Sequence, residues 1–447
     1  MMKMKIKITD FSYLGEGKKK QLLVAMSIEG SKTVVSTAVR VDLYNISYFA
    51  ERINKLYSSL FLLSAEVYAI DRAISRKKDS INGWTRELDV EFKIPCATQF
   101  QSLSSNINHL LSFLTGDYWS CSFKESPVIE WCHQEDVVDY DEVTQVNLFS
   151  GGMDSLIGAI DYLENTDNHH KVFLASHYDS IMKGPKKDQE RIVNELKIKY
   201  PGRFIYLPAV GITPMKSKEL TCRSRSFMFL SIAMMIAAHK SNIVIVPENG
   251  PVSLNFPLSA SRRAACSTRT THPLFIQNVR DLLNNLGLPI IINNPYEFRT
   301  KGEMVNECKN IQYLLSIVDK SNSCGKRGGH QFMPNNPHAS HCGRCMPCMY
   351  RKASLIHYID PSSYGINMRT LFTKTKKISN DFYAMLNFLK KDLSSIDIAN
   401  ELLVMGIKKS NPKFDDYICL VERTREELKD LLRKEATVSI KSYVGLI

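Results

Sequence analysis

The sequence predicts an α/β protein whose central region forms a parallel, doubly wound sheet. From Gln145 onward, short apolar runs alternate with segments of helical periodicity, as in folds where helices cover both faces of a parallel sheet. A glycine turn follows the first apolar run, at the place where doubly wound folds bind phosphate groups. The pattern changes on both sides of this region, so we expect an α+β domain before it and a helical extension after it.

Residues 1–140 are expected to form the α+β domain, which is a candidate docking site for a partner protein. Two runs near the start alternate polar and apolar side chains as strands do, with the turn EGKKK between them. The acidic segment at 133–143 is a candidate linker. The predicted elements are strands at 3–11 and 20–30, a helix at 48–74, a strand at 86–95, and a helix, turn and strand within 104–123.

Residues 141–360 hold the alternating pattern, and residues 361–447 are expected to form the helical extension. The predicted strands are QVNLF, HKVFLASH, RFIYLPA, NIVIVPE and LPIIINNP, which begin at residues 145, 170, 203, 242 and 288. The predicted helices between them cover residues 154–164, 186–200, 225–239 and 272–287. In the extension, helical periodicity covers residues 381–407 and 424–436.

The composition indicates which partners and which cellular compartment to expect for this protein. The formal net charge is +12, which favours acidic partners such as nucleotides and leaves nucleic acid as a candidate. The longest apolar run, Phe227–Ala238, is too short to span a bilayer, and the first residues lack the apolar segment of a secretory signal. We therefore expect a cytoplasmic protein without a membrane partner, in which thiols stay reduced.

The glycine turn has the chemistry of a phosphate site. Two glycines let the backbone turn sharply, so that N–H groups converge, and the following helix adds its own unpaired N–H groups. Serine hydroxyls can donate to phosphate oxygens, and Asp154 can hold Mg²⁺ that binds phosphate. The alternative is a plain strand–turn–helix in which Asp154 caps the helix. The candidate nucleotide-binding residues are Ser150, Gly151, Gly152, Met153, Asp154 and Ser155.

Four of the 11 cysteines lie in a polar, glycine-rich segment that could hardly bury free thiols. They are Cys324, Cys342, Cys345 and Cys348. Four thiolates suit a tetrahedral Zn²⁺ site, whereas the C-x-x-C-x-x-C run also suits an iron–sulfur cluster. The sequence therefore predicts a metal site, with zinc as the favoured metal. Competing ligands nearby are His330, His338 and His341.

The string SGGMDS resembles the PP-loop signature SGGxDS of the ATP pyrophosphatases, enzymes that split ATP between the α and β phosphates. Together with CGRCMPCMYRKA it resembles the 7-cyano-7-deazaguanine synthase (QueC) family, which has a PP-loop α/β fold and a C-terminal four-cysteine zinc site. The resemblance covers about Val143 to His357. Longer QueC-like proteins occur in bacterial anti-phage defence, and the chain is most similar to the QueC-like members of the Qat systems.

The resemblance extends to three further stretches. RSRSFMFLSIAMMIA is similar to the RNxxFLSxA helix of the family, with Arg225 in the arginine position. NPYEFRTKGEMV, which contains Lys301 and Glu303, is similar to a P…xKxEIV stretch of the family. ASHYDSIMKGPKKDQERIV, which contains Lys186 and Lys187, occupies the place of the segment that includes the second strand of the family. The chain departs from the family at PENGPVSLNFP and in a longer loop between the first zinc cysteine and the other three.

The resemblance implies a site that binds ATP, Mg²⁺ and a deazaguanine. The candidate catalytic residues are Asp154, Ser155, Arg225 and Lys301, and the candidates for neutralising phosphate charge are Lys186, Lys187, Arg225 and Lys301. Glu248 and Asn249 follow a strand, at the sheet edge where ligands bind. Glu248 is a candidate acceptor for the N1–H and amino groups of the deazaguanine; a helix cap or turn carboxylate is the alternative.

The family converts 7-carboxy-7-deazaguanine to the nitrile with ATP and ammonia. The resemblance therefore implies an adenylating C–N ligase, in which ATP is split to AMP and pyrophosphate and an amine attacks the activated carboxylate. In a defence setting we expect the amine to come from a partner protein, for instance an exposed N-terminus, because the additional N-terminal domain can dock one.

Two other interpretations are open from the sequence. One is a plain nitrile-forming synthase or a PP-loop enzyme that modifies tRNA, which the basic charge favours mildly. The other is a zinc-stabilised adaptor that binds ATP as a signal or not at all. The intact SGGMDS string argues against the adaptor, because Ser150, Asp154 and Ser155 have little value to a pure scaffold.

Overall fold

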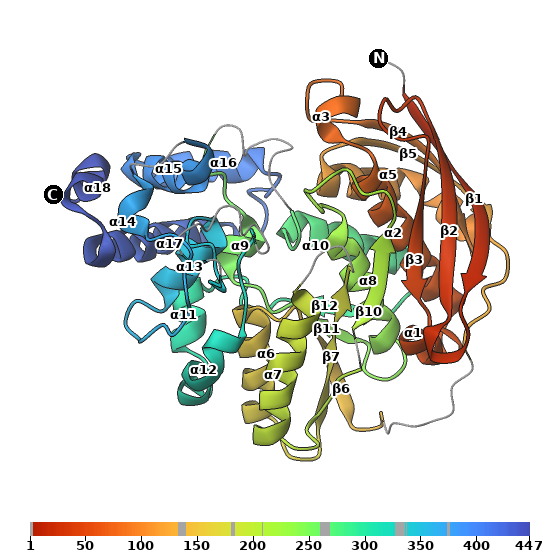
Figure 1. Cartoon of the computed structure of the whole chain (residues 1–447), viewed down its shortest axis with the longest axis horizontal. Coiled ribbons are helices and arrows are strands. Elements are labelled where there is room, and N and C mark those ends of the chain that lie inside the picture. Colours follow the sequence, from red (N-terminus) through yellow and green to blue (C-terminus); the bar gives the residue numbers. More distant parts are fainter. Residues whose placement is uncertain are drawn as a thin grey trace.

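A computed structural model describes residues 3–132, 140–179, 184–207, 209–259, 269–326, 336, 338–372 and 376–447. Most of the predicted linker, as well as His330, lies outside the described residues. Figure 1 shows a large sheet formed mainly by the first part of the chain, a smaller sheet beside it, and a group of C-terminal helices on the opposite side of the molecule.

The larger sheet is mixed and has seven strands in the order β5-β4-β1-β2-β3-β10-β8. The strands are β1 (Met4–Leu14), β2 (Gln21–Glu29), β3 (Ser36–Asp42), β4 (Glu87–Ile94), β5 (Tyr118–Glu125), β8 (His177–Tyr178) and β10 (Val210–Pro214). β2 pairs antiparallel with β1 and β3, whereas β4 and β5 run parallel to β1. Alternate residues of β2 and β4 are buried, so one face of the sheet packs on the core.

Two strands of this sheet, β3 and β10, were not predicted from the sequence. They pair with each other antiparallel, with Ile212 opposite Val41 and Thr213 opposite Arg40. β3 has the β-branched, alternating pattern of a strand around Val39 and Val41, which the prediction missed, whereas β10 is a short run of five residues. Their pairing with each other joins distant parts of the chain. Because β8 and β10 follow residue 140, the sheet spans the predicted domain boundary, which stays a prediction.

The smaller sheet is entirely parallel, with the strand order β12-β11-β6-β7-β9. Its strands are β6 (Val143–Leu148), β7 (Lys171–Ala175), β9 (Phe204–Ile205), β11 (Ile243–Ile245) and β12 (Ile291–Asn293). Each of them overlaps one of the five predicted strand segments, although β6 begins two residues before its segment, so the predicted parallel sheet is confirmed. The strand order reverses between β6 and β11.

Helices cover both faces of the parallel sheet. Successive side chains of β7 point to opposite faces and join two different cores. Val172 and Leu174 join the core formed with α6 and α7, whereas Phe173 and Ala175 join the core formed with α8 and α10. The four helices that cover the sheet are α6 (Met153–Asn165), α7 (Pro185–Lys199), α8 (Arg225–Ala237) and α10 (Pro273–Asn285).

Within the part of the chain that the structure describes, no helix combines the length and the apolar character needed to cross a membrane.

The N-terminal helices lie beside the seven-stranded sheet (Figure 1). They are α1 (Tyr44–Ala50), α2 (Lys55–Ala73), α3 (Arg76–Asp79), α4 (Ala97–Ser102) and α5 (Ser104–Thr115), with a 3₁₀ turn η1 (Gly17–Lys19) before them. The predicted helix at 48–74 is two helices, because Asn54 caps α2 by accepting a hydrogen bond from the Leu56 N–H. α2 packs on α8 and on β3, β4 and β10.

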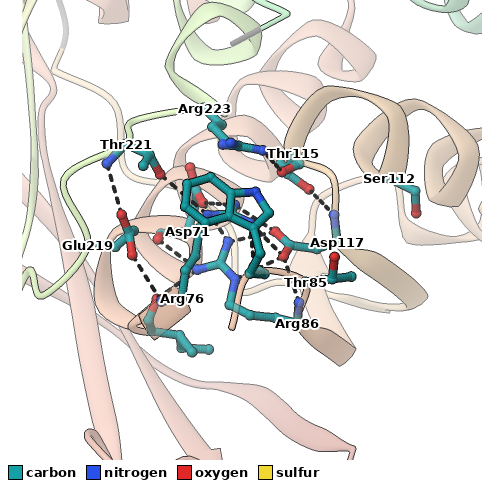
Figure 2. A network of polar contacts seen from close by, with 12 residues as sticks. Asp71, Arg76, Thr85, Arg86, Ser112, Thr115, Asp117, Glu219, Thr221 and Arg223 are labelled. Atoms are coloured by element: carbon teal, nitrogen blue, oxygen red, sulfur yellow. Dashed lines mark hydrogen bonds and ion pairs between the residues drawn. The ribbon is translucent and has the colours of Figure 1, made fainter. Parts of the chain in front are cut away.

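A buried network of arginines and aspartates joins the N-terminal helices to the central region (Figure 2). Arg86 pairs with Asp71 and Asp117 at 2.6 Å each, and Arg76 pairs with the same two carboxylates at 3.0 and 2.8 Å. Burial alone would raise the pKa of both aspartates, but the two arginines hold them below the usual value. Asp71 also accepts from the N–H and hydroxyl of Ser224, which fixes the start of α8.

Glu66, a fully buried residue of α2, provides a test of how pH affects stability. Burial raises the pKa of the Glu66 carboxyl well above its usual value, and Lys93 lowers it only in part. The folded chain therefore keeps this proton at a pH where the unfolded chain releases it. As pH rises from the pKa of Glu66 in the unfolded chain to its pKa in the folded chain, we expect the free energy of unfolding to fall by about 1.4 kcal/mol per pH unit.

The variant Glu66→Gln removes the titrating group and should remove this dependence, so that it gains stability over the wild type as pH rises. Denaturant unfolding at several pH values above the ordinary pKa of glutamate measures the effect. Glu16→Gln is the matched control, because Glu16 is exposed. Equal pH slopes for the wild type and Glu66→Gln would contradict the prediction.

The C-terminal helices enclose a second core, which also contains three of the four clustered cysteines. They are α13 (Met346–Ser354), α14 (Met368–Leu371), α15 (Lys376–Lys390), α16 (Ser395–Val404), α17 (Phe414–Glu435) and α18 (Val438–Val444). The periodicity at 381–407 belongs to two helices, because Ser394 and Asp397 form a capping box that starts α16. Before these helices come α9 (Gly250–Leu254), α11 (Lys301–Asn306), α12 (Ile311–Ile317) and the 3₁₀ turn η3 (Val318–Lys320).

Candidate nucleotide and metal sites

The glycine turn follows β6 at the point where the strand order of the parallel sheet reverses. Crevices at such points bind ligands in open α/β sheets. Gly151 has a φ angle of +83°, and a Cβ atom at this position would lie 3.1 Å from the backbone N of Gln189 in α7. Glycine is therefore required at position 151, because a side chain would be strained and would crowd α7.

The serine hydroxyls of the turn lie beside the N-terminus of α6. Ser155 Oγ donates to the Gly152 carbonyl at 2.9 Å and lies 3.4 Å from Ser150 Oγ. The Gly152 N–H is weakly engaged, because its acceptor Ser150 Oγ is 3.3 Å away. Gly152 is the N-cap of α6 and has no side chain that could cap the helix. Hydroxyl and N–H groups therefore converge where an anion can bind.

Asp154 is buried and does not cap α6, the alternative role considered from the sequence. Its Oδ1 forms an ion pair with the Lys301 ammonium group. Its Oδ2 accepts from Asn249 twice, from Nδ2 at 2.5 Å and from the backbone N–H at 3.3 Å. Burial alone would raise the pKa of Asp154, but Lys301, Glu248 and Asn249 together hold it below the usual value.

The two partners of Asp154 are each positioned by the start of a helix. Lys301 is the first residue of α11, where Thr300 and Glu303 form a capping box. Asn249 is the N-cap of α9, and its Oδ1 accepts a backbone N–H from the first turn at 3.1 Å. This bond fixes the amide orientation, so that Nδ2 donates to Asp154.

Glu248 follows β11 and lies beside Asp154. Burial and the Asp154 carboxylate raise the pKa of Glu248 well above its usual value, and a hydrogen bond between the two carboxyl groups contributes to the shift. The pair therefore retains a proton to a higher pH than isolated carboxyl groups would. Two adjacent carboxyl groups beside a phosphate-type turn have the oxygen ligands that Mg²⁺ prefers.

Arg225 begins α8 and is connected to the glycine turn through Gln189. Arg225 Nε donates to His177 Nε2 at 3.0 Å, and Gln189 Nε2 donates to the His177 carbonyl at 3.1 Å. Gln189 is also the residue whose backbone N would lie 3.1 Å from a Cβ atom added at position 151. Burial and Arg225 lower the pKa of His177 well below its usual value, so His177 stays neutral and can accept this hydrogen bond.

Lys186 and Lys187 lie in the first turn of α7, the helix that crowds the glycine turn. The Lys186 ammonium group lies 5.0 Å from the ring centroid of Tyr178, and Lys187 is exposed. The structure thus brings three candidate residues to Asp154, namely Glu248, Asn249 and Lys301. Arg225 is linked to the turn through His177 and Gln189, and the two lysines belong to the helix that contains Gln189.

The four predicted metal-binding cysteines are brought to one place. Their sulfur atoms all lie within 4.8 Å of one another, with Cys345 and Cys348 at 3.3 Å and Cys342 and Cys348 at 3.8 Å. A tetrahedral Zn²⁺ site with Zn–S bonds of about 2.3 Å has sulfur atoms about 3.8 Å apart. Backbone N–H groups of Cys342 and Arg344 point at Cys324 Sγ and Cys342 Sγ, which favours thiolates. The cluster could therefore bind zinc.

The histidines considered as competing ligands do not join this cluster in the described part of the chain. The Nε2 atom of His341 accepts from the Ser323 N–H at 3.4 Å, and its Nδ1 atom lies 2.8 Å from Ser340 Oγ. His338 is exposed. The ligand set that the geometry supports is four cysteines.

A short segment joins the cysteine cluster to the glycine turn, and the sequence did not identify it. The Asn322 N–H donates to the Gly151 carbonyl at 2.9 Å, and the Met153 N–H lies 3.4 Å from Ser323 Oγ. Asn322 Oδ1 also accepts from the Cys324 N–H at 2.9 Å. The only signal in the sequence is that Asn322 and Ser323 directly precede the first of the four cysteines.

No protein-family model matches the sequence, and no curated protein matches it. Fold and site together define a mixed α/β protein with a parallel sheet and four cysteines at one site.

Proposed function

We propose that this chain is an ATP-dependent adenylating enzyme that splits ATP to AMP and pyrophosphate and activates a 7-deazaguanine carboxylate for attack by an amine. The observation that supports it most is the placement of SGGMDS. The turn lies where the strand order reverses, and its Asp154 is buried against Lys301 and Asn249. The PP-loop fold and the ligands ATP, Mg²⁺ and a deazaguanine are also part of this proposal. They are inferred from the resemblance of the motifs.

The polar groups of the turn suit the phosphates of ATP. The N–H groups of Gly152 and Met153 have long contacts of 3.3 and 3.4 Å, so a phosphate oxygen can replace their present acceptors. Lys301 is buried beside Asp154, so its ammonium group would lie near a phosphate that binds at the turn. Asp154 and Glu248 would hold Mg²⁺, which would neutralise phosphate charge.

The chemistry explains why ATP is used. A carboxylate repels nucleophiles and has a poor leaving group. In the proposed reaction its oxygen attacks the α phosphorus, the bond to the β phosphate breaks, and pyrophosphate leaves. An amine then attacks the acyl carbon, loses a proton, and releases AMP. The part of the protein is positioning and charge neutralisation.

The acceptor amine and the cellular setting are also part of the proposal. We propose a defence role in which an amine of a partner protein attacks the adenylate and the reaction stops at the amide. The seven-stranded sheet and its helices, which lie on the opposite side of the molecule from the C-terminal helices (Figure 1), are the proposed docking region for this partner. Mass spectrometry of a partner co-expressed with this chain should show a deazaguanine-sized addition; an unmodified partner would contradict this.

The product of ATP tests the proposed function directly. The wild type and Asp154→Ala are incubated with ATP, Mg²⁺, 7-carboxy-7-deazaguanine and ammonium, and AMP is separated from ADP. We expect AMP and pyrophosphate only with the wild type and only when the deazaguanine is present. AMP at the same level in both proteins would contradict the assignment of Asp154, and no AMP with any amine, including that of a co-expressed partner, would favour the adaptor.

A further inference from the structure

Helix α17 lies against the segment that carries Lys301. This helix belongs to the C-terminal extension, outside the stretch of chain on which the proposed function rests. Its contacts come from side chains on one face of the helix. They are Tyr417 to Glu297, Arg423 to the Phe298 carbonyl and to Glu303, and Glu427 to the Gly302 N–H.

The contact of Glu427 is made to the first turn of α11. Both carboxyl oxygens of Glu427 accept from the Gly302 N–H, at 3.1 and 3.0 Å, and Gly302 directly follows Lys301. Unpaired N–H groups at a helix start attract a carboxylate. A Cβ atom at Gly302 would lie 2.7 Å from Glu427 Oε2, so the absence of a side chain lets Glu427 approach.

Arg423 reinforces the same helix start. Its Nε atom pairs with Glu303 Oε1 at 2.7 Å, while Glu303 Oε2 accepts from the Thr300 N–H at 2.9 Å in the capping box. The Arg423 side chain is about two-fifths exposed, so this ion pair contributes little free energy by itself. Glu427 is half-buried, and its partner Gly302 is the residue next to Lys301 in the sequence.

α17 also contacts the second element that holds Asp154. A Cβ atom at Gly250 would lie 2.6 Å from Leu420 Cδ2, and Gly250 directly follows Asn249. The Gly250 N–H in turn donates to the Arg299 carbonyl at 2.8 Å. One helix of the extension therefore packs on both chain segments that present Lys301 and Asn249 to Asp154.

We propose that Glu427 is a positioning residue, which holds α11 so that Lys301 meets Asp154, and that the C-terminal extension is thereby part of the catalytic unit. This inference rests on the proposed adenylating function. It assigns a role to a residue that touches neither the turn nor Asp154, and it predicts that the extension cannot be changed at this contact without affecting catalysis.

The test compares Glu427→Ala, Glu427→Gln and Gly302→Ala with the control Glu426→Ala, in the full-length chain. Glu426 is the neighbouring, exposed carboxylate, which pairs with Lys429. We expect Glu427→Ala and Gly302→Ala to lower kcat for AMP formation by about 10–100-fold, because displaced catalytic groups have effects of this size. Glu427→Gln should recover part of the rate, since its amide oxygen can accept the Gly302 N–H. Glu426→Ala should match the wild type.

Hydrogen–deuterium exchange supplies a readout that does not depend on ATP. The Gly302 amide should exchange faster in Glu427→Ala than in the wild type or in Glu426→Ala. Wild-type kcat in a folded Glu427→Ala would overturn the inference, as would wild-type amide exchange. If Glu427→Ala does not fold, the decision rests on Glu427→Gln and Gly302→Ala, and wild-type kcat in both overturns it. If the wild type itself forms no AMP, the proposed adenylating function is refuted. This outcome differs from a failure of the inference about Glu427, in which the wild type forms AMP and the variants match it.

Discussion

If the proposed function holds, replacing Lys301 by methionine should lower the rate of AMP formation by about 10²–10³-fold, because the site loses the cation proposed to face the developing phosphate charge. The same change leaves the Asp154 carboxylate buried without its ion-pair partner. Removing one member of a buried pair costs about 3–5 kcal/mol of stability. Steady-state kinetics and denaturant unfolding measure the two effects.

The double variant Asp154→Asn/Lys301→Met separates stability from catalysis. It removes both charges, so we expect most of the lost stability to return while AMP formation stays low. Lys309→Met is the control, because Lys309 is an exposed lysine just beyond α11. Recovery of activity in the double variant, or a wild-type rate in Lys301→Met, would show that Lys301 does not act on the phosphates.

Loss of a metal bound by the four clustered cysteines should have the largest effect on stability. Three of the four clustered cysteines are part of the core that α13, α15 and α17 also form, and structural zinc sites contribute about 10–16 kcal/mol of apparent binding free energy. We expect Cys342→Ser to lose bound metal and to melt at a much lower temperature than the wild type. Elemental analysis and thermal unfolding measure these changes, and a visible absorption band would distinguish an iron–sulfur cluster from zinc.

The matched control is Cys419→Ser, since Cys419 is exposed on α17, outside the cluster. It should keep the wild-type metal content and melting temperature. Milder chelation should reduce AMP formation before the fold is lost, because Asn322 links the glycine turn to Cys324. Full metal content in Cys342→Ser would contradict the four-cysteine site.

The sequence by itself determined the parallel sheet and the grouping of the cysteines. β7 and β11 carry continuous apolar runs, as expected where helices cover both faces of a parallel sheet. Gly151 could be recognised because its positive φ angle excludes side chains. The regular spacing of Cys342, Cys345 and Cys348 was informative for a similar reason, because metal coordination demands particular residues at short spacing.

The tertiary structure alone decided what depends on contacts between distant residues. β3 and β10 come from distant parts of the chain, and only the folded structure shows that they lie side by side. The grouping of Glu248, Asn249 and Lys301 around Asp154 required the strand order and the starts of α9 and α11. No pattern in α17 indicates that Glu427 accepts the Gly302 N–H, because a helix face shows which residues lie together but not what they contact.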